Sequence, residues 1–369
     1  MVLAEPHDKK STPYTTVIQA KEDRTEYSER KHESNESKRS ILLKRIPLEK
    51  LMDLKVDYAF KQLFGNEKNK NITVAFLNAI LQTTGRDPIK DISFTNTDLG
   101  GEYVDDKGSR LDLLVVTDAN EQINVEIQFA NEHNMVQRST YYWSRVYSNP
   151  LEKGMGYSEL HPVIAINILN YDLFSQTKRF HTSFHLYEDE DQFKLADVME
   201  FHFIEMGKLI KAWKNDKLDP WNNVLARWLL MLGMVDRKHE QVYDDIYKEL
   251  EVIAMNDETL RKAFENWEEL SLTQEQRIAY EYRFKQIVDE EAGRRDTELW
   301  AQRKVEEETR KAREEAREEA MEEAREEAEQ RVKEVARRLL EKDMEIEFVV
   351  ESTGLTKDKV IEIQHDMQK

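Results

Sequence analysis

Cysteine is absent from this chain of 369 residues, so it has no disulfide, no thiolate metal ligand and no cysteine nucleophile. Long apolar runs are also absent: the run over residues 163–169, for example, is much shorter than the roughly 20 residues that cross a bilayer. The opening segment, MVLAEPHDKKSTPYTT, lacks the apolar stretch of a secretory signal. We therefore expect a soluble, cytoplasmic protein with no membrane partner.

Glycine is scarce as well, and none of the 11 glycines stands in a GxxxxGK or GxGxxG pattern. Phosphate-binding loops of ATP and dinucleotide sites need such glycines, so neither cofactor is indicated. The nine histidines are scattered. His181 and His185 share one face of an expected strand, but no third ligand lies nearby in the sequence, so a zinc site is not indicated either.

Acidic residues outnumber basic ones by 74 to 55, which gives a formal net charge of −19. Such a surplus argues against non-specific nucleic-acid binding if the charge is spread evenly. It is not: residues 312–329 alone carry nine Glu and three Arg, whereas residues 134–150 carry Arg138 and Arg145 and no acid. Local charge must therefore decide which partners bind.

Composition divides the chain into five segments. Residues 1–45 are polar and aperiodic, which predicts a disordered leader, with a DNA-contacting arm as the alternative. Residues 46–205 are predicted to form the main domain and 206–292 a helical domain. Residues 293–342 form one long Glu/Arg-rich helix, and 343–369 a small helical hairpin around a Thr-Gly turn.

Hydrophobic periodicity predicts an α/β main domain. Two helical stretches before residue 85 are followed by segments in which apolar residues alternate with polar ones. Strands are expected at 91–97, 110–117, 123–129 and 162–169, with weaker ones at 180–187 and 198–204. Because helices stand before and after these strands, we expect a sheet that is covered on both faces.

Two acids in this pattern point to chemistry. Asp112 and Glu126, with 13 residues between them, lie in otherwise apolar strands that a short turn joins into a hairpin. Ionised carboxylates in such strands are costly unless they are paired or bind a cation, and Mg²⁺ prefers oxygen ligands of this kind. The simpler alternative is a half-exposed sheet from which both acids point into solvent.

The order of these elements resembles the PD-(D/E)XK nuclease fold, and more closely the recombination-promoting nuclease (Rpn) family of putative transposases. The matching pieces are DYAFKQLFG, FLNAIL, RLDLLV, NVEIQ, QRSTYYWSRVY and PVIAINIL, between residues 57 and 169. The resemblance implies a restriction-endonuclease-like core, with Asp112 and Glu126 as ligands of Mg²⁺ or another divalent cation and DNA as the substrate.

One position departs from the wider nuclease superfamily. Gln128 stands where those enzymes usually have lysine, although the Rpn family generally has this glutamine. Its amide can orient a water or a phosphate oxygen but supplies no charge. Lys61 is a candidate for the missing cation and Asp57 for a third acid, since they are spaced for one helical face. The alternative is an ordinary surface ion pair between them.

The helix after the third strand carries the candidate DNA contacts. Arginine beside aromatic residues suits contacts with phosphates and bases, and here the set is Gln137, Arg138, Tyr141 and Arg145. The alternative is that the aromatic rings belong to the core while the arginines reach water.

The Glu/Arg-rich helix is most simply a solvated, semi-rigid rod, with homo-oligomer formation through a coiled coil as the alternative. The final hairpin suits a protein contact better than a DNA-reading helix-turn-helix. These observations together predict a Mg²⁺-dependent endonuclease that hydrolyses DNA. The family resemblance implies a role in recombination, mobile elements or phage defence. A catalytically silent scaffold and a strand-transferring transposase are the alternatives.

Overall fold

The computed structural model describes residues 42–82, 85–99, 109–131 and 134–367. The predicted leader therefore lies outside the described residues, except for its last four positions. The chain forms two compact units, Met1–Asp289 and Glu290–Lys369. Helix α9, Gln274–Leu340, begins in the first unit and continues into the second.

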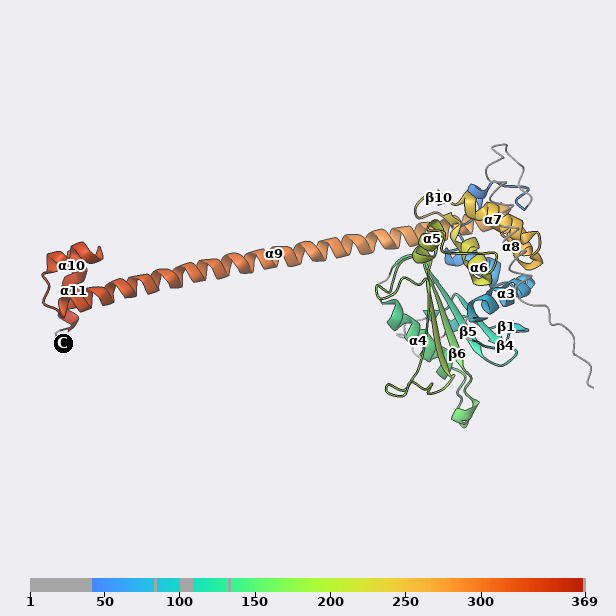
Figure 1. Cartoon of the computed structure of the whole chain (residues 1–369), viewed down its shortest axis with the longest axis horizontal. Helices are drawn as coiled ribbons and strands as arrows, with labels where there is room; N and C mark the ends of the chain where they lie inside the picture. The colour runs from blue at the N-terminus through green and yellow to red at the C-terminus, as the bar shows by residue number, and fades with distance from the viewer. Residues whose placement is uncertain (1–41, 83–84, 100–108, 132–133, 368–369) are drawn as a thin grey trace, which may run out of the picture. The chain divides into compact units, whose positions relative to one another are not determined.

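The first unit is built on a mixed six-stranded sheet (Figure 1). Its strand order is β1-β4-β5-β6-β8-β7, in which β5, β6 and β8 run parallel and the other neighbours run antiparallel. The bounds are β1 Ile92–Phe94, β4 Leu113–Thr117, β5 Gln122–Gln128, β6 Val163–Leu169, β7 His181–His185 and β8 Met199–Glu205.

Helices cover both faces of this sheet, as alternating apolar side chains require. On one face Leu114, Val163 and Ala165 pack against Tyr142 and Trp143 of α4, Met135–Ser148. On the other face Val125 and the isoleucines of β5 and β6 join the main core. Figure 1 shows α4 and α3, Lys70–Leu81, on opposite sides of the sheet. The predicted α/β class, a mixed sheet flanked by helices, is confirmed.

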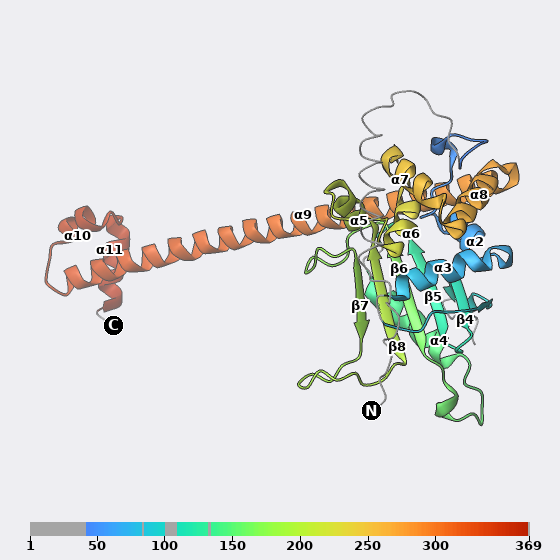
Figure 2. The same cartoon turned by 45° about the vertical axis from the view of Figure 1, so that its right-hand side comes forward.

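The remaining helices of the first unit form a bundle that shares this core. Helices α2 and α3 pack against α8, and α3 also packs against α6 (Figure 2). The bounds are α2 Asp57–Phe64, α5 Met206–Lys214, α6 Val224–Gly233, α7 Asp244–Ala254 and α8 Glu258–Leu272. Three 3-10 helices complete the unit: Leu48–Lys50, Glu67–Asn69 and Tyr157–Glu159. It also has two short antiparallel strand pairs: β2 Asp98–Leu99 with β3 Ser109–Arg110, and β9 Val235–Asp236 with β10 Gln241–Val242.

The hydrophobic core continues across residue 205, where we expected one domain to end and the next to begin. One hydrophobic cluster includes Leu42 and Phe60 at its start and Trp267 and Ile287 at its end. Residues 42–45, which we assigned to the leader, are also packed, because Leu42 and Leu43 are buried and Arg45 pairs with Glu268 at 3.1 Å. The helical region and the sheet therefore bury one continuous apolar interior.

The strand predicted over 110–117 is interrupted. Residues 109–110 form β3 with β2, and β4 starts only at Leu113, so Leu111 and Asp112 stand between two different sheets. The weak strands predicted at 180–187 and 198–204 are present as β7 and β8. Period-two patterns reveal a strand but not the sheet it joins, which explains why the interruption has no signal in the sequence.

The second unit contains the end of α9 and two short helices, α10 Ile346–Thr353 and α11 Lys357–Met367. Gly354, with φ of 72°, ends α10 in the left-handed conformation that glycine adopts readily. Five buried side chains hold this end together: Ala336, Leu340, Val349, Val360 and Ile363. The Glu-rich stretch is solvent-exposed, with i,i+4 ion pairs such as Glu307–Lys311 at 2.8 Å. None of the helices in the described ranges is long and apolar enough to cross a membrane.

A buried ion pair between Lys55 and Asp53, which also contacts the backbone at Val235, predicts a large stability effect. Lys55 Nζ lies 2.8 Å from Asp53 Oδ1 and donates to the carbonyl of Val235 at 2.6 Å, with both side chains at most 2% exposed. The variant Lys55→Met leaves the carboxylate buried without its cation. We expect a loss of about 3–5 kcal/mol in the free energy of unfolding, measured by urea denaturation.

The exposed Lys50→Met is the matched control and should change stability by less than about 0.5 kcal/mol. A Lys55→Met loss no larger than that of the control would contradict the importance assigned to this pair.

Candidate metal and DNA site

Asp112 and Glu126 face each other one position beyond the last paired residues of the β4–β5 hairpin. The register ends at Leu113 opposite Val125. At the next position the backbone N–H groups donate to carboxylate side chains instead of to backbone carbonyls. The N–H of Asp112 donates to Glu126 Oε1 at 3.2 Å, and the N–H of Ile127 donates to Asp112 Oδ2 at 2.9 Å. These reciprocal bonds hold the two carboxylates side by side.

Both carboxylates are buried, Asp112 at 9% exposure and Glu126 at 1%. Burial raises the pKa of Asp112, in opposition to the nearby charge of Lys61. Burial raises the pKa of Glu126 well above its ordinary value, and the negative charge of Asp112 raises it further. The positive charge near the pair is therefore too small to keep the pKa values of both carboxyl groups in their ordinary range.

Two cations approach the pair from helices on opposite faces of the sheet. Lys61 of α2 places Nζ 2.8 Å from Asp112 Oδ1. Arg138 of α4 places Nη2 3.9 Å from Glu126 Oε2, and its guanidinium lies 5.2 Å from the ring centre of Tyr142. Both cationic side chains are partly exposed, so the site opens toward solvent where they stand.

Asp57 and Lys61 do not pair with each other. Although they lie one turn apart on α2, Lys61 reaches Asp112, whereas Asp57 pairs with the guanidinium of Arg283. Nε of Arg283 lies 2.9 Å from Asp57 Oδ1, and Nη2 lies 2.9 Å from Oδ2. Arg283 belongs to the first turns of α9. Asp57 is still near enough for its charge to raise the pKa of Asp112. The structure thus places Asp57 beside the site, with its carboxylate held by another helix.

Gln128 occupies β5 two residues after Glu126 and is 9% exposed. Because side chains alternate along a strand, Gln128 shares a face with Glu126, as the sequence predicts. Its backbone carbonyl accepts a hydrogen bond from Asn170 at 2.9 Å.

The candidate DNA contacts on α4 are divided between surface and core. Gln137 and Tyr141 are exposed, Arg138 and Arg145 are partly buried, and Tyr142 belongs to the core. The helix therefore has an aromatic, buried face and a polar, accessible face.

The residues present fit a divalent cation. Among the described residues no group of three or more His, Cys, Asp or Glu side chains is placed to hold a metal ion. Two carboxylates suffice for Mg²⁺, which keeps several of its waters. The telling atom is Glu126 Oε2, which is buried yet accepts no hydrogen bond from the described part of the chain. A bound cation would satisfy a buried carboxylate oxygen that accepts no hydrogen bond.

A family model described as PD-(D/E)XK nuclease family transposase matches residues 54–297. The chain belongs to this family. The match covers the sheet, both acids and the helical bundle, and it supports a nuclease-like or transposase-like function. It also agrees with the Rpn-like resemblance found in the sequence. Comparisons with curated proteins and with solved structures give no match.

Two side chains at this site were missed by sequence reasoning. Arg283, the partner of Asp57, lies 226 positions away and has no local signal. Asn167 did have one, because it is the single polar residue in the apolar strand VIAINIL, and in β6 it pairs in register with Glu126.

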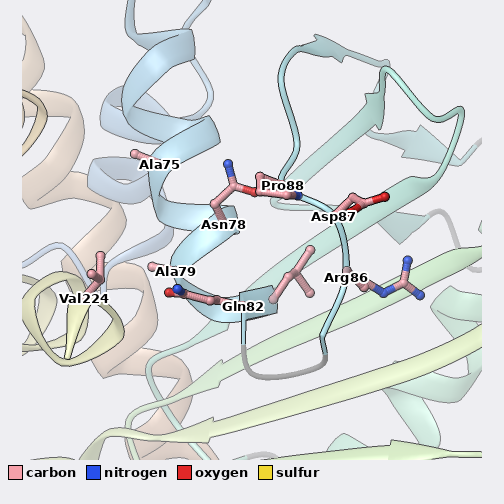
Figure 3. A pocket seen from close by; sticks show the side chains of 9 residues that line it. Ala75, Asn78, Ala79, Gln82, Arg86, Asp87, Pro88 and Val224 are labelled. Carbon is pink, nitrogen blue, oxygen red and sulfur yellow. The ribbon is translucent and has the colours of Figure 1, made fainter. Parts of the chain in front are cut away.

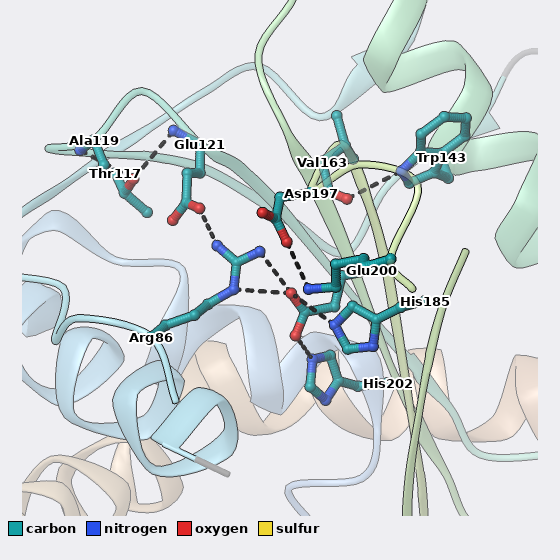
Figure 4. Close-up of polar contacts among 11 residues, drawn as sticks. Arg86, Thr117, Ala119, Glu121, Trp143, Val163, His185, Asp197, Glu200 and His202 are labelled. Atoms are coloured by element: carbon teal, nitrogen blue, oxygen red, sulfur yellow. Dashed lines mark hydrogen bonds and ion pairs between the residues drawn. The ribbon is translucent and has the colours of Figure 1, made fainter. Parts of the chain in front are cut away.

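A second group of charged side chains surrounds Glu200 (Figure 4). The strand register places Phe203, and not Glu200, on the face of Glu126, so Glu200 projects from the opposite face of the sheet. Glu200 accepts from Arg86 Nη2 at 2.6 Å and contacts His202 Nε2 at 2.8 Å, and His202 Nδ1 lies 2.8 Å from His181 Nε2. Arg86 also pairs with Glu121. Burial alone would raise the pKa of Glu200, but His202 and Arg86 lower it to about 2. This group is internally satisfied and resembles a structural network.

The pocket beside Arg86 also lacks the features of a catalytic site. It has a volume of about 200 Å³ between α3, the segment of Asp87 and Pro88, and Val224 (Figure 3). Asp87 is the only acid that lines it within the described residues, so no pair of carboxylates faces this space.

The network at Glu200 predicts a specific acid sensitivity. Its folded pKa of about 2 lies below the ordinary 4.5, so its stabilising effect is present above pH 4.5 and is lost as the pH falls toward 2. The effect is about 3 kcal/mol. Glu200→Gln should lower stability at pH 7, and the difference from wild type should shrink at pH 3 and below, as measured by urea midpoints.

The control is Glu190→Gln, which changes an exposed carboxylate of the neighbouring turn. A constant difference between wild type and Glu200→Gln from pH 7 to pH 2 would show that Glu200 acts through packing rather than charge.

Proposed function

We propose that this chain is a divalent-metal-dependent DNA endonuclease that hydrolyses phosphodiester bonds. The observation that carries the proposal is the pair of buried carboxylates, Asp112 and Glu126, held at facing positions with Glu126 Oε2 left without a hydrogen bond from the described residues. In the Glu200 network, by contrast, both carboxylate oxygens have hydrogen-bond partners.

Asp112 and Glu126 would hold the metal, for which Mg²⁺ is the natural candidate because the donors are hard oxygens. When bound, the ion supplies a Lewis acid that activates water and offsets charge developing on the phosphate. The carboxylates are kept in place before metal binding by the backbone N–H groups of Asp112 and Ile127.

Lys61 is proposed to stabilise the negative charge of the scissile phosphate. It now neutralises Asp112, and a cation at the two carboxylates would take over that task and leave the ammonium donors for a phosphate oxygen. Gln128 is proposed to orient the attacking water or a phosphate oxygen through its amide. Asp57, held by Arg283, is proposed to position α2 and thereby Lys61.

The accessible face of α4 is the proposed DNA contact. Gln137 and Tyr141 are exposed, and Arg138 and Arg145 supply positive charge in a segment without acids. Because phosphate contacts release counterions, binding to DNA should weaken steeply as salt increases.

Strand transfer is the second candidate function, since the family model is described as a transposase family. Hydrolysis leaves free ends, whereas strand transfer joins a cleaved end to a target strand, so the products distinguish the two. We propose a biological role in recombination, mobile-element activity or phage defence, with homo-oligomer formation through α9 as a further possibility for assembly. A catalytically silent scaffold would give neither product.

The first prediction for this function concerns the acids. With Mg²⁺ present, wild-type protein should nick or linearise supercoiled plasmid, and EDTA should abolish the activity. Asp112→Asn and Glu126→Gln should each lower the cleavage rate by a factor of about 10³ or more, since each removes a metal ligand together with its charge.

Asp91→Asn is the control, because this exposed acid pairs with Lys70 at the edge of the sheet, away from the site. Equal cleavage by wild type and both acid variants would identify a contaminant and remove the site assignment. Absence of cleavage in every preparation would favour the scaffold.

The second prediction concerns Lys61. Lys61→Met keeps the length of the side chain but removes the ammonium group, so the cleavage rate should fall by a factor of about 10² to 10³. Lys70→Met, on the neighbouring helix, removes a charge that pairs with the exposed acids Glu67 and Asp91 and should leave the rate unchanged. A Lys61→Met enzyme that cleaves at the wild-type rate would refute the proposed role.

A further inference from the structure

Three oxygen-bearing side chains occupy one row across three neighbouring chain segments. Asp112 faces Glu126 one position beyond the β4–β5 register, and Glu126 pairs in register with Asn167 of β6. The next residue of the row, Phe203 of β8, is apolar. Side chains at paired positions of neighbouring strands project from the same face, about 5 Å apart. Asn167 therefore stands beside Glu126, on the side away from Asp112.

The orientation of the Asn167 amide follows from one hydrogen bond. Nδ2 donates to the backbone carbonyl of His202 at 3.1 Å, and only the amide nitrogen can donate to a carbonyl. His202 belongs to β8, and β6 lies between β8 and β5. Oδ1, the other branch of the amide, therefore points away from that carbonyl, on a side chain that stands beside Glu126 in the row.

This oxygen is buried and unsatisfied. Asn167 is 1% exposed, and Oδ1 accepts no hydrogen bond from the residues that the structure describes. Glu126 Oε2 is in the same condition. Leaving a buried acceptor without a donor costs about 1–3 kcal/mol. Two such acceptors in adjacent positions indicate a shared ligand that offers positive charge or hydrogens.

Helix α4 places a buried polar side chain over this row, Ser139. Met135 at its start packs with Leu169 at the end of β6, while Trp143 donates from Nε1 to the carbonyl of Val163 at the start of β6, at 3.0 Å. Ser139 lies midway between them on the helix and therefore over the middle of the strand, where Asn167 stands. It is 1% exposed, and Oγ has no hydrogen-bond partner among the described residues.

We propose that Asn167 is a further residue of the cation site, and that its Oδ1 accepts a hydrogen bond from a water bound to the ion that Asp112 and Glu126 hold. This inference rests on the proposed function. Mg²⁺ retains several waters, and each needs an acceptor when it is buried. Asn167 is thus a positioning residue: it fixes one water of the ion next to Glu126 and is not itself a ligand.

The test measures metal binding without DNA. Mn²⁺ is titrated into the full-length protein, and free Mn²⁺ is followed by electron paramagnetic resonance. Asn167→Leu should raise the dissociation constant 10- to 100-fold, the usual effect of losing an acceptor that supports a metal site. Asn167→Asp keeps an oxygen there and adds negative charge, so it should bind Mn²⁺ at least as tightly as wild type.

Asn124→Leu is the matched control. Asn124 is also 1% exposed in β5, and its Oδ1 likewise lacks a partner in the described chain, but its register neighbours are Leu114 and Ala165 rather than carboxylates. Its dissociation constant should equal that of wild type. Circular dichroism melts in EDTA report whether each variant folds.

Each outcome is decisive. Wild-type affinity in Asn167→Leu, or the same loss in Asn124→Leu, would overturn the role of Asn167 while leaving the proposed function intact. Weaker binding by a folded Asn167→Asp would also overturn it, and this variant serves if Asn167→Leu does not fold. No Mn²⁺ binding by wild type would contradict the proposed function itself, and the role of Asn167 with it.

Discussion

The reciprocal hydrogen bonds between Asp112 and the Glu126–Ile127 segment hold the two carboxylates of the candidate site in adjacent positions. At the point where the β4–β5 ladder stops, each strand would expose unpaired backbone groups, and the two carboxylates take the place of the missing carbonyls. Satisfying the backbone in this way forces two negative charges into adjacent buried positions. Two cations partly offset the repulsion between these carboxylates. Lys61 comes from a helix on one face of the sheet and Arg138 from a helix on the other.

The comparison of two buried glutamates in one sheet shows what separates a structural site from a candidate functional one. Glu200 is surrounded by Arg86 and His202, and their charges and hydrogen bonds outweigh burial, so its pKa falls to about 2. Around Glu126, the charges of Arg138 and Lys61 and one backbone N–H do not outweigh burial and the negative charge of Asp112, so its pKa rises well above the ordinary value. The described residues therefore place too little positive charge near Glu126 to keep its pKa in the ordinary range.

The helical bundle contributes to the site although none of its residues is a ligand in our proposal. Asp57 and Arg283 join α2 to α9, and Lys55 with Asp53 joins the segment before α2 to Val235. These contacts hold the helix that carries Lys61. They also give a physical reason for a family match that runs from residue 54 to 297, well past the sheet. The catalytic geometry we propose depends on both parts of one core.

The amino-acid sequence by itself determined the α/β class, the principal strands, the facing of Glu126 and Gln128, and the prominence of Asp112, because side-chain alternation and helical periodicity are local properties of the backbone. Only the tertiary structure decided that Asp112 lies at a break between two sheets, that Lys61 and Asp57 turn to different partners, and that Asn167 stands beside Glu126. Each of these facts depends on which distant segments pack together, and the free energy of that packing comes from burying one shared core rather than from any local pattern.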